Sequence, residues 1–170
     1  MKKSKQRRGH KTTSQTPKPA VTNRRASFDY ELSDNLTVGL ELTGAEVKAA
    51  RLGRVQLRGA YVTVRGTSNP ELFLINASFS LATHVPKNSS QATSTVDTRP
   101  RRLLAKRKEI DALVIKKNSG LTIVPTKLLT AGRYIKLVIA LGKGKKKYDK
   151  RESIKRRDLA RENAKFLKQS

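Results

Sequence analysis

The sequence predicts a mainly β fold, a small closed antiparallel barrel with short helices, carried between two disordered basic arms. Three observations lead to this prediction. Short segments of alternating apolar and polar residues recur along the middle of the chain, and two of their junctions have the composition of hairpin turns. Basic residues gather at the two ends, where residues 1–25 contain nine Lys or Arg and no acidic residue. Residues 143–170 contain twelve basic and four acidic residues.

This uneven charge divides the chain into three parts. Residues 1–22 combine low hydrophobicity, high charge and two prolines, which is typical of a disordered arm. Residues 23–142 contain most of the apolar residues and are numerous enough to bury a core of their own. Residues 143–170 follow as a basic C-terminal tail.

The first elements after the arm are predicted to be strands followed by a short helix. Apolar and acidic residues alternate over residues 28–32, which indicates a half-buried strand, and residues 37–42 continue the alternation. The period changes over residues 43–51, where a Thr-x-x-Glu pattern ending in Glu46 predicts a capping box at the start of a helix. Gly53 is expected to end that helix.

The middle of the chain predicts a hairpin and then the longest helix. Residues 61–65 and 71–76 flank the turn sequence Gly-Thr-Ser-Asn-Pro, which favours a hairpin. Residues 82–98 are rich in Ser, Thr and Gln and are expected to form a loop or an irregular edge. Residues 101–117 have a recognisable apolar face and predict a helix, with Pro100 at its start.

A second hairpin is predicted near the end of the ordered part. Residues 121–129 and 134–141 surround the turn sequence Thr-Ala-Gly-Arg. Many short antiparallel strands with helices between hairpins favour an OB-fold barrel. Gly142 and Gly144 are expected to end the last strand, because the complete phosphate-loop pattern that could involve them is absent.

The composition points to a polyanionic partner and away from catalysis. The net charge is +25 over 170 residues, and there is no cysteine. Disulfides, zinc fingers and thiol chemistry are therefore excluded. The two histidines, His10 and His84, fall in the arm and in the irregular segment, and no metal-ligand spacing is present. The sequence predicts no catalytic residue, no metal and no cofactor, and no apolar run is long enough to cross a membrane.

The tail is charged but is patterned to begin a helix. Asp149 is a good N-cap, Glu152 follows at the capping-box position, and Glu152 and Arg156 are four residues apart. Few apolar residues could bury this helix against the protein's own core. Tyr148 is either a solvated residue or a ring that stacks on a base.

Several sequence blocks together resemble those of the bacterial SsrA-binding protein family, also called small protein B. They occur in the family's order and spacing over residues 23–158, and they are NRRASFDYEL, LTGAEVKAARLG, AYVTVR, FLINASF, TRPRRLLAKRKEID, GLTIVPTKLL and ALGKGKKKYDKRESIKRRD. The resemblance implies a cytoplasmic, monomeric, non-enzymatic adaptor with an OB fold. Such proteins bind the tRNA-like domain of tmRNA and deliver it to stalled ribosomes in trans-translation, with elongation factor Tu as a partner through the tmRNA complex.

The resemblance also implies residues that contact tmRNA. Leu104 and Lys136 fall at the family's RNA-contacting positions, although Leu104 could equally be a core residue and Lys136 an ordinary surface lysine. Further candidates come from the first block and from charge, and Arg101 and Arg102 could instead be a solvated helix face. These further candidates are Asn23, Arg24, Arg25, Arg51, Arg99, Arg101 and Arg102. The acidic residue that the family usually has two positions before the glycine of TVG is Thr37 here, which puts one RNA contact in doubt.

For the tail, the resemblance implies that it becomes helical in the empty mRNA channel beside the decoding centre of the small subunit. The residues expected to contact the ribosome are Lys143, Lys145, Lys146, Lys147, Tyr148, Asp149, Lys150, Arg151, Ile154, Lys155, Arg156 and Arg157. The alternative function is that of a general basic RNA-binding or ribosome-associated protein. A hydrolase of stalled peptidyl-tRNA is disfavoured because the chain contains no Gly-Gly-Gln sequence.

Overall fold

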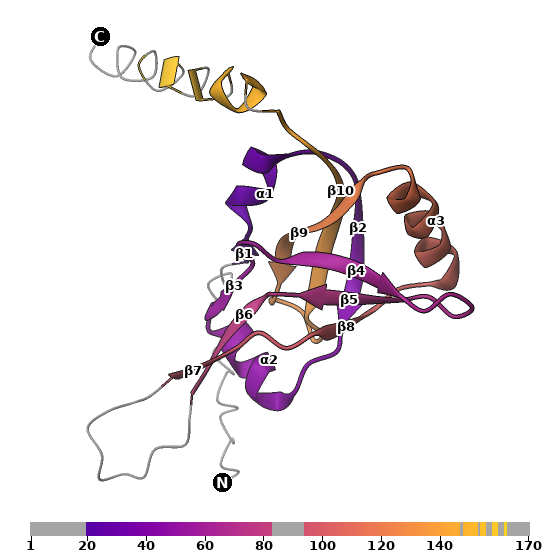
Figure 1. Cartoon of the computed structure of the whole chain (residues 1–170). Helices are drawn as coiled ribbons and strands as arrows, with labels where there is room; N and C mark the ends of the chain where they lie inside the picture. Colours follow the sequence, from indigo (N-terminus) through magenta and orange to yellow (C-terminus); the bar gives the residue numbers. More distant parts are fainter. Residues whose placement is uncertain are drawn as a thin grey trace, which may run out of the picture.

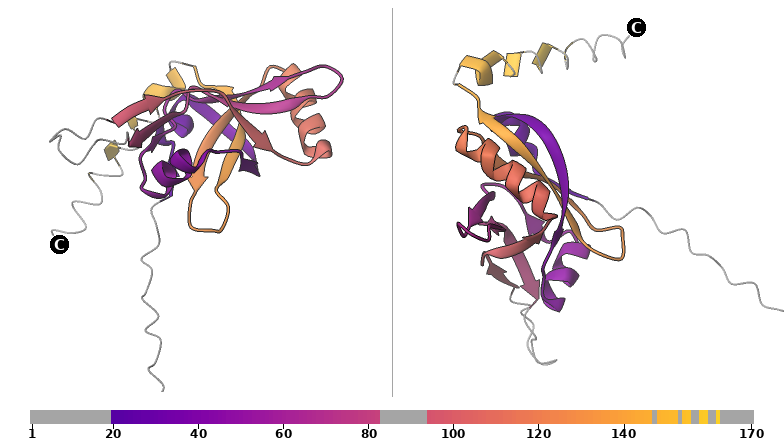
Figure 2. Two further views of the ribbon diagram at one scale, coloured as in Figure 1. Left: turned by 90° about the horizontal axis from the view of Figure 1, so that it is seen from below. Right: turned by 90° about the vertical axis from the view of Figure 1, so that its right-hand side faces the viewer.

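A computed structural model describes residues 20–82, 94–146, 148–152, 154–155, 158–159 and 162 of the chain. Its strands and short helices are arranged as Figures 1 and 2 show. The helices are α1 (Arg24–Asp29), α2 (Gly44–Arg51) and α3 (Arg107–Asn118). The strands are β1 (Val21–Thr22), β2 (Tyr30–Leu40), β3 (Val55–Gln56), β4 (Tyr61–Arg65), β5 (Glu71–Ile75), β6 (Ser78–Ala82), β7 (Ser94–Asp97), β8 (Arg101–Leu104), β9 (Thr122–Leu129) and β10 (Lys136–Gly144).

The strands form an antiparallel ring, which confirms the prediction of a mainly β, OB-like fold. The larger sheet has the order β1-β9-β10-β2-β8-β5-β4, and β4 also pairs with β9 through Val62 and Ile123. That pairing closes the six strands from β9 to β4 into what we call the strand ring. A small sheet, β3-β6-β7, extends from it beside α2.

The inward faces of the ring strands supply the core. Leu72 and Leu74 of β5 and Leu137 and Ile139 of β10 are completely buried, whereas the residues between them are partly exposed. This alternation is what a sheet with one buried face produces. Phe79 of β6 is also fully buried and extends the same core toward α2.

Both predicted hairpins and the helix over residues 43–51 are confirmed. The Thr43 hydroxyl accepts a hydrogen bond from the Glu46 N–H, and the Glu46 carboxylate accepts one from the Thr43 N–H at 2.7 Å. Gly53 follows the helix with a φ of 73°, a left-handed conformation that suits glycine. Local signals of this kind need no distant partner, which is why the sequence predicts these elements well.

The predicted strand over residues 28–32 is wrong in its first half, because residues 24–29 form α1. The Asn23 side chain accepts a hydrogen bond from the Ala26 N–H and caps this helix. Arg25 and Asp29 then form an ion pair one helical turn apart. Strand β2 begins only at Tyr30, so the apparent alternation crosses a helix–strand boundary.

The predicted helix over residues 101–117 is also wrong at its start. Residues 101–104 form strand β8 between β2 and β5, and α3 begins at Arg107. Pro100 therefore precedes a strand and does not begin a helix. The strand alternates, with Arg101 and Leu103 pointing inward, but a buried arginine hides that alternation from a hydropathy pattern.

The boundaries of the two basic arms also change. Val21 and Thr22, predicted to lie in the N-terminal arm, pair with Leu128 and Lys127 as β1. Lys143 and Gly144, predicted to lie in the tail, extend β10 and pair with β2. The remaining prediction for the N-terminal arm lies outside the described residues, as does the part of the predicted loop or irregular edge over residues 83–93. Residues 94–97 of that predicted segment form β7, the edge strand of the small sheet. The described tail residues from 148 to 162 are helical (Figure 1).

Candidate nucleic-acid interface

The predicted tmRNA-binding residues lie at two opposite ends of the strand ring. Lys136, at the start of β10, pairs with Gly39, whereas Gly144, at the end of β10, pairs with Tyr30. These two ends are separated by eight residues of strand, or roughly 26 Å. Arg24 and Arg25 belong to α1, directly before Tyr30, so they lie at the end from which the tail leaves (Figure 1).

Leu104 and Lys136 meet at the other end, on either side of Gly39. Gly39 pairs with Leu104 of β8 and with Lys136 of β10. A Cβ atom on Gly39 would lie 3.1 Å from the Leu104 Cβ, so a side chain at this position would press on Leu104 and shift it by a few tenths of an ångström. Leu104 is 52% exposed although it is a large apolar residue in the middle of a sheet. A hollow of about 510 Å³ lies here, and its lining includes Leu42 and Tyr134.

Tyr134 and Arg133 complete this surface, although the sequence alone does not single them out as site residues. Tyr134 is 69% exposed, and the Arg133 guanidinium lies 5.4 Å from the centre of its ring. Arg51 of α2 donates a hydrogen bond to the Arg133 carbonyl at 3.3 Å. The apolar run over residues 134–141 predicts that Tyr134 is the first residue of a strand, but β10 begins only at Lys136. The neighbouring Gly132 and Arg133 are the signal that could have placed Tyr134 in an exposed basic turn.

Arg102 and Arg99 border a second hollow beside the first. This hollow has a volume of about 470 Å³, and its lining includes Phe73 and Leu42, which also lines the first hollow. Arg102 forms an ion pair with Glu71, and its side chain is about half exposed. We use "the Lys136 face" for the continuous surface made by Gly39, Leu42, Arg51, Leu104, Arg102, Arg133, Tyr134 and Lys136. It combines cationic side chains with exposed aromatic and apolar ones.

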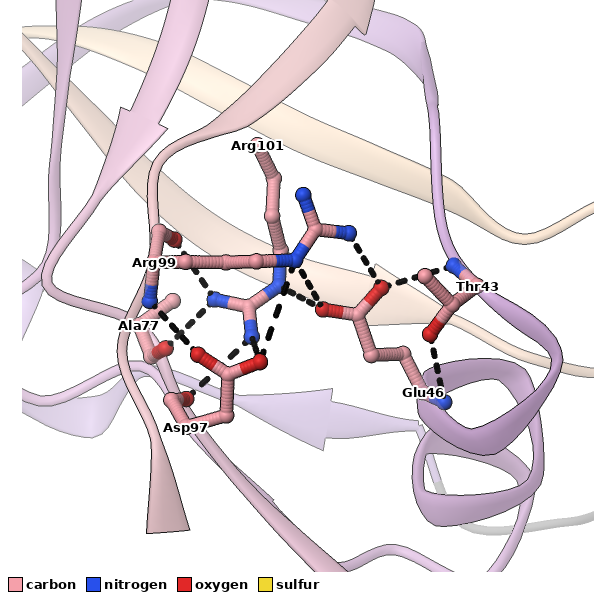
Figure 3. A network of polar contacts seen from close by, with 6 residues as sticks. All are labelled: Thr43, Glu46, Ala77, Asp97, Arg99 and Arg101. Atoms are coloured by element: carbon pink, nitrogen blue, oxygen red, sulfur yellow. Dashed lines mark hydrogen bonds and ion pairs between the residues drawn. The ribbon is translucent and has the colours of Figure 1, made fainter.

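Arg101 does not belong to this surface, which corrects its assignment as an RNA contact. Its side chain is completely buried, and its guanidinium lies 3.9 Å from the centre of the Phe79 ring. It donates hydrogen bonds to the Glu46 carboxylate at 2.7 Å and to the Ala77 carbonyl at 3.0 Å (Figure 3). With no exposed surface, Arg101 acts as a core residue that joins α2 to β8.

Arg99 supports the same buried carboxylate from the outside. Its Nε and Nη2 atoms donate to the two oxygens of Glu46 at 3.0 and 2.7 Å. Burial alone would raise the pKa of Glu46, but the hydrogen bonds from Arg99, the Thr43 N–H and Arg101 outweigh it and lower that pKa to about 2. Arg99 remains partly exposed, so it can also present charge to the second hollow.

Asn23 is likewise a structural residue. Its carbonyl oxygen accepts from the Ala26 N–H, and its amide donates to the carbonyls of Leu57 and Pro125 at 3.0 and 2.9 Å. These bonds occupy the side chain, which is buried, so the assignment of Asn23 as a direct RNA contact is corrected. It joins α1 to the strand ring and thereby positions the exposed Arg24 and Arg25.

The tail helix begins one turn earlier than predicted. The Lys150 N–H donates to the Lys146 carbonyl at 3.2 Å, and the Asp149 carboxylate accepts from the Lys146 N–H at 3.0 Å. Asp149 is therefore in the third helical position, where its carboxylate still supports the helix start, and Lys146 takes the cap position. Tyr148 is 64% exposed and Ile154 is 43% exposed. Among the other predicted tail residues, Lys147, Arg156 and Arg157 lie outside the described residues.

The described residues contain no cluster of three or more metal-ligating side chains. Within the same part of the chain, no helix is long and apolar enough to span a membrane.

Comparisons with known proteins agree on one family. A family model described as "SmpB protein" matches residues 20–169. An SsrA-binding protein of Oenococcus oeni is 43% identical over 148 residues, covering 86% of this chain and 90% of the relative. One of a Nostoc species is 41% identical over 157 residues, covering 91% and 96%. A chain from a solved structure described as "tmRNA-SmpB: a journey to the center of the bacterial ribosome" is 31% identical, with a TM-score of 0.55, and the match covers 80% of this chain and 94% of that one.

Proposed function

The chain belongs to the SmpB family of SsrA-binding proteins, and from this premise we propose that it is an RNA-binding adaptor of trans-translation. In this proposal the Lys136 face binds the tRNA-like domain of tmRNA, and the tail acts on the stalled ribosome. The protein works as a monomer in the cytoplasm without catalysing a reaction, and it meets elongation factor Tu only through the tmRNA complex.

The main support for assigning the Lys136 face to RNA binding is that Leu104 and Lys136 both pair with Gly39. The sequence separates these two side chains by 32 positions, yet both flank one glycine on neighbouring strands. A lysine can neutralise a phosphate, while exposed Leu104 and Tyr134 offer apolar and aromatic surfaces to unpaired bases. Such a combination suits a folded RNA with exposed loops better than a uniform double helix.

The tail supplies the second half of the proposal. Its described residues include exposed cations and the exposed rings or apolar groups of Tyr148 and Ile154, with no core beside them. We propose that the tail beyond Gly144 occupies the vacant mRNA channel of the small subunit as a helix, near the decoding centre. A message that still fills the channel would exclude the tail sterically, which would restrict rescue to empty ribosomes.

The first experiment is RNA binding by the full-length protein at near-physiological salt, with three competing RNAs. We expect a preference of at least two orders of magnitude for the tRNA-like domain of tmRNA over elongator tRNA and a random RNA. Equal binding to all three would favour a general RNA-binding protein.

The variant Lys136→Ala sharpens this test. It is expected to weaken tmRNA binding and to reduce the slope of log K against log salt by about 0.7 to 0.9, the value for one lost phosphate contact. The matched control is Lys116→Ala, because Lys116 is an exposed lysine on α3 that forms an ion pair with Asp34. If both variants reduce affinity and slope equally, the Lys136 face is not a specific site.

A further inference from the structure

Asp29 lies at the junction between α1 and the tail and contacts both. Its carboxylate oxygen Oδ1 lies 2.9 Å from Lys150 Nζ, and Oδ2 lies 2.7 Å from Arg25 Nε. Its backbone carbonyl accepts a hydrogen bond from the Lys145 N–H at 2.9 Å. One residue of α1 therefore binds the start of the tail helix through its side chain and the segment before that helix through its backbone.

Neighbouring contacts reinforce this junction. Lys145 Nζ donates to the Ser27 carbonyl at 3.0 Å. The carbonyls of Ser27 and Asp29 lie in the last turn of α1, where carbonyl groups carry partial negative charge and attract cations. The Phe28 ring has Arg25 and Lys150 at 5.1 and 5.9 Å from its centre, so both cations that bind Asp29 also lie near one aromatic ring.

The Asp29–Lys150 pair is better shielded from water than the exposed Lys116–Asp34 pair on α3 and β2. The Lys150 and Asp29 side chains are 32% and 23% exposed, whereas those of Lys116 and Asp34 are 46% and 60% exposed. The hydrogen bond from Lys150 is the largest cause that lowers the pKa of Asp29, and Arg25 adds to it against the effect of burial. The carboxylate is therefore charged at neutral pH and available to hold the tail.

The short segment that joins β10 to the tail helix needs contacts of this kind to fix its direction. Gly144 ends β10, and a Cβ atom on it would have no neighbour within 4 Å, so the space on that side of the strand end is open. Beyond Gly144, α1 contacts the tail through Ser27, Phe28 and Asp29.

We propose that Asp29 is a positioning residue for the tail and that Lys150 acts through it and not as a phosphate ligand. The ion pair fixes the first helical turn on α1, so that the tail leaves the strand ring in one direction. One part of this inference rests on the proposed function, namely that a tail held in one direction would reach the mRNA channel when tmRNA occupies the Lys136 face. The direction itself is a property of the free protein.

The direction of the tail can be measured by the distance between two spin labels. The chain contains no cysteine, so single cysteines at exposed Asn118 of α3 and exposed Leu159 of the tail would carry the labels. We expect a narrow distance distribution in the otherwise unchanged protein and a broad one in Asp29→Asn. The control Glu31→Gln changes an exposed carboxylate two residues away and is expected to keep the distribution narrow.

The charge swap Asp29→Lys with Lys150→Asp separates positioning from RNA contact. It restores an ion pair of the opposite polarity between positions 29 and 150, and Arg25→Gln is included because Arg25 would otherwise repel the new lysine. We expect this variant to return the narrow distribution and most of the peptide tagging on stalled ribosomes. Asp29→Asn and Lys150→Ala alone are expected to reduce tagging at least tenfold while tmRNA affinity stays within twofold. That unchanged affinity also shows that the variants are folded.

Two results would overturn the inference. A distribution that stays equally narrow in Asp29→Asn would show that Asp29 does not hold the tail. A swap that restores the narrow distribution but not tagging would make Lys150 a direct phosphate ligand. If instead no variant and not even the unchanged protein supports tagging, the proposed function fails, while the distance measurement still decides whether Asp29 positions the tail.

Discussion

Replacing Glu46 by Gln should destabilise the protein by up to about 3 kcal/mol, because Glu46 is a buried anion that holds two arginines. Its carboxylate accepts four hydrogen bonds, from the Thr43 N–H, from Arg99 Nε and Nη2, and from Arg101 Nε. Glutamine retains the size of the side chain but removes the charge and turns an amide N–H₂ toward two guanidinium groups. Arg101 would then be a buried cation that has lost its buried partner and keeps only the partly exposed carboxylate of Asp97, 3.5 Å from its Nη2 atom.

Two independent routes give this magnitude. The pKa of Glu46 is lowered from 4.5 to about 2, and each unit corresponds to about 1.4 kcal/mol, which gives about 3 kcal/mol in favour of the charged form. Removing one partner of a buried ion pair typically costs about 3–5 kcal/mol. Glu46 and Arg101 are both completely buried, but the Arg99 side chain is 43% exposed, so water screens its share and about 3 kcal/mol is the upper end of the expected loss.

Urea unfolding followed by circular dichroism at pH 7 measures the loss. With a slope of about 2 kcal/mol per molar urea, a loss of about 3 kcal/mol lowers the midpoint by about 1.5 M. The matched control is Glu71→Gln, which removes the partly exposed ion pair with Arg102 and should cost no more than about 1 kcal/mol. A loss below about 1 kcal/mol for Glu46→Gln would refute the reasoning.

The same carboxylate predicts a pH dependence. Since its pKa is lower in the folded than in the unfolded state, its contribution is fully present above about pH 4.5 and is lost as the pH falls toward 2. Glu46→Gln should remove this part of the acid sensitivity. An unchanged acid profile in the variant would show that other groups cause the loss of stability at low pH.

Two further predictions concern the Lys136 face and the tail. Gly39→Ala should weaken tmRNA binding several-fold in an RNA titration, because the new Cβ would press on the Leu104 Cβ at 3.1 Å and disturb the paired residues Leu104, Gly39 and Lys136. Unchanged affinity would show that the spacing of these three residues does not matter for binding. Replacing residues 149–151 by alanine should preserve tmRNA affinity and abolish peptide tagging, measured with stalled ribosomes; a loss of tmRNA binding instead would mean that the tail contributes only general charge.

The parts of the fold that the sequence predicts are those with local causes. The capping box at Thr43 and the turns of both hairpins depend on residues a few positions apart. Strand β8 could not be predicted in this way, because burial of Arg101 depends on Glu46, which is 55 residues away. The alternation over residues 28–32 was misleading because Asn23 begins a helix whose last residue is Asp29.

The candidate site also contains residues that the sequence can predict and residues whose place depends on the fold. Leu104 and Lys136 came from the resemblance to a family, and the register of β8, β2 and β10 then explained why they belong together. The sequence could not show that Arg24 and Arg25 lie at the opposite end of the ring. It also could not show that Tyr134 leaves the strand, since hydropathy does not separate the first residue of a strand from the last residue of a turn.

Strand β10 begins at Lys136 and continues to Gly144, where the tail starts, so one strand joins the proposed RNA face to the tail. It is paired with β2 on one side and β9 on the other. A force that pulls on the tail would act along β10, and the interstrand hydrogen bonds of β10 are perpendicular to that direction. These bonds would therefore have to break together and not one at a time. Tension between a bound RNA and an anchored tail would therefore be shared among the hydrogen bonds that β10 makes with both of its neighbours.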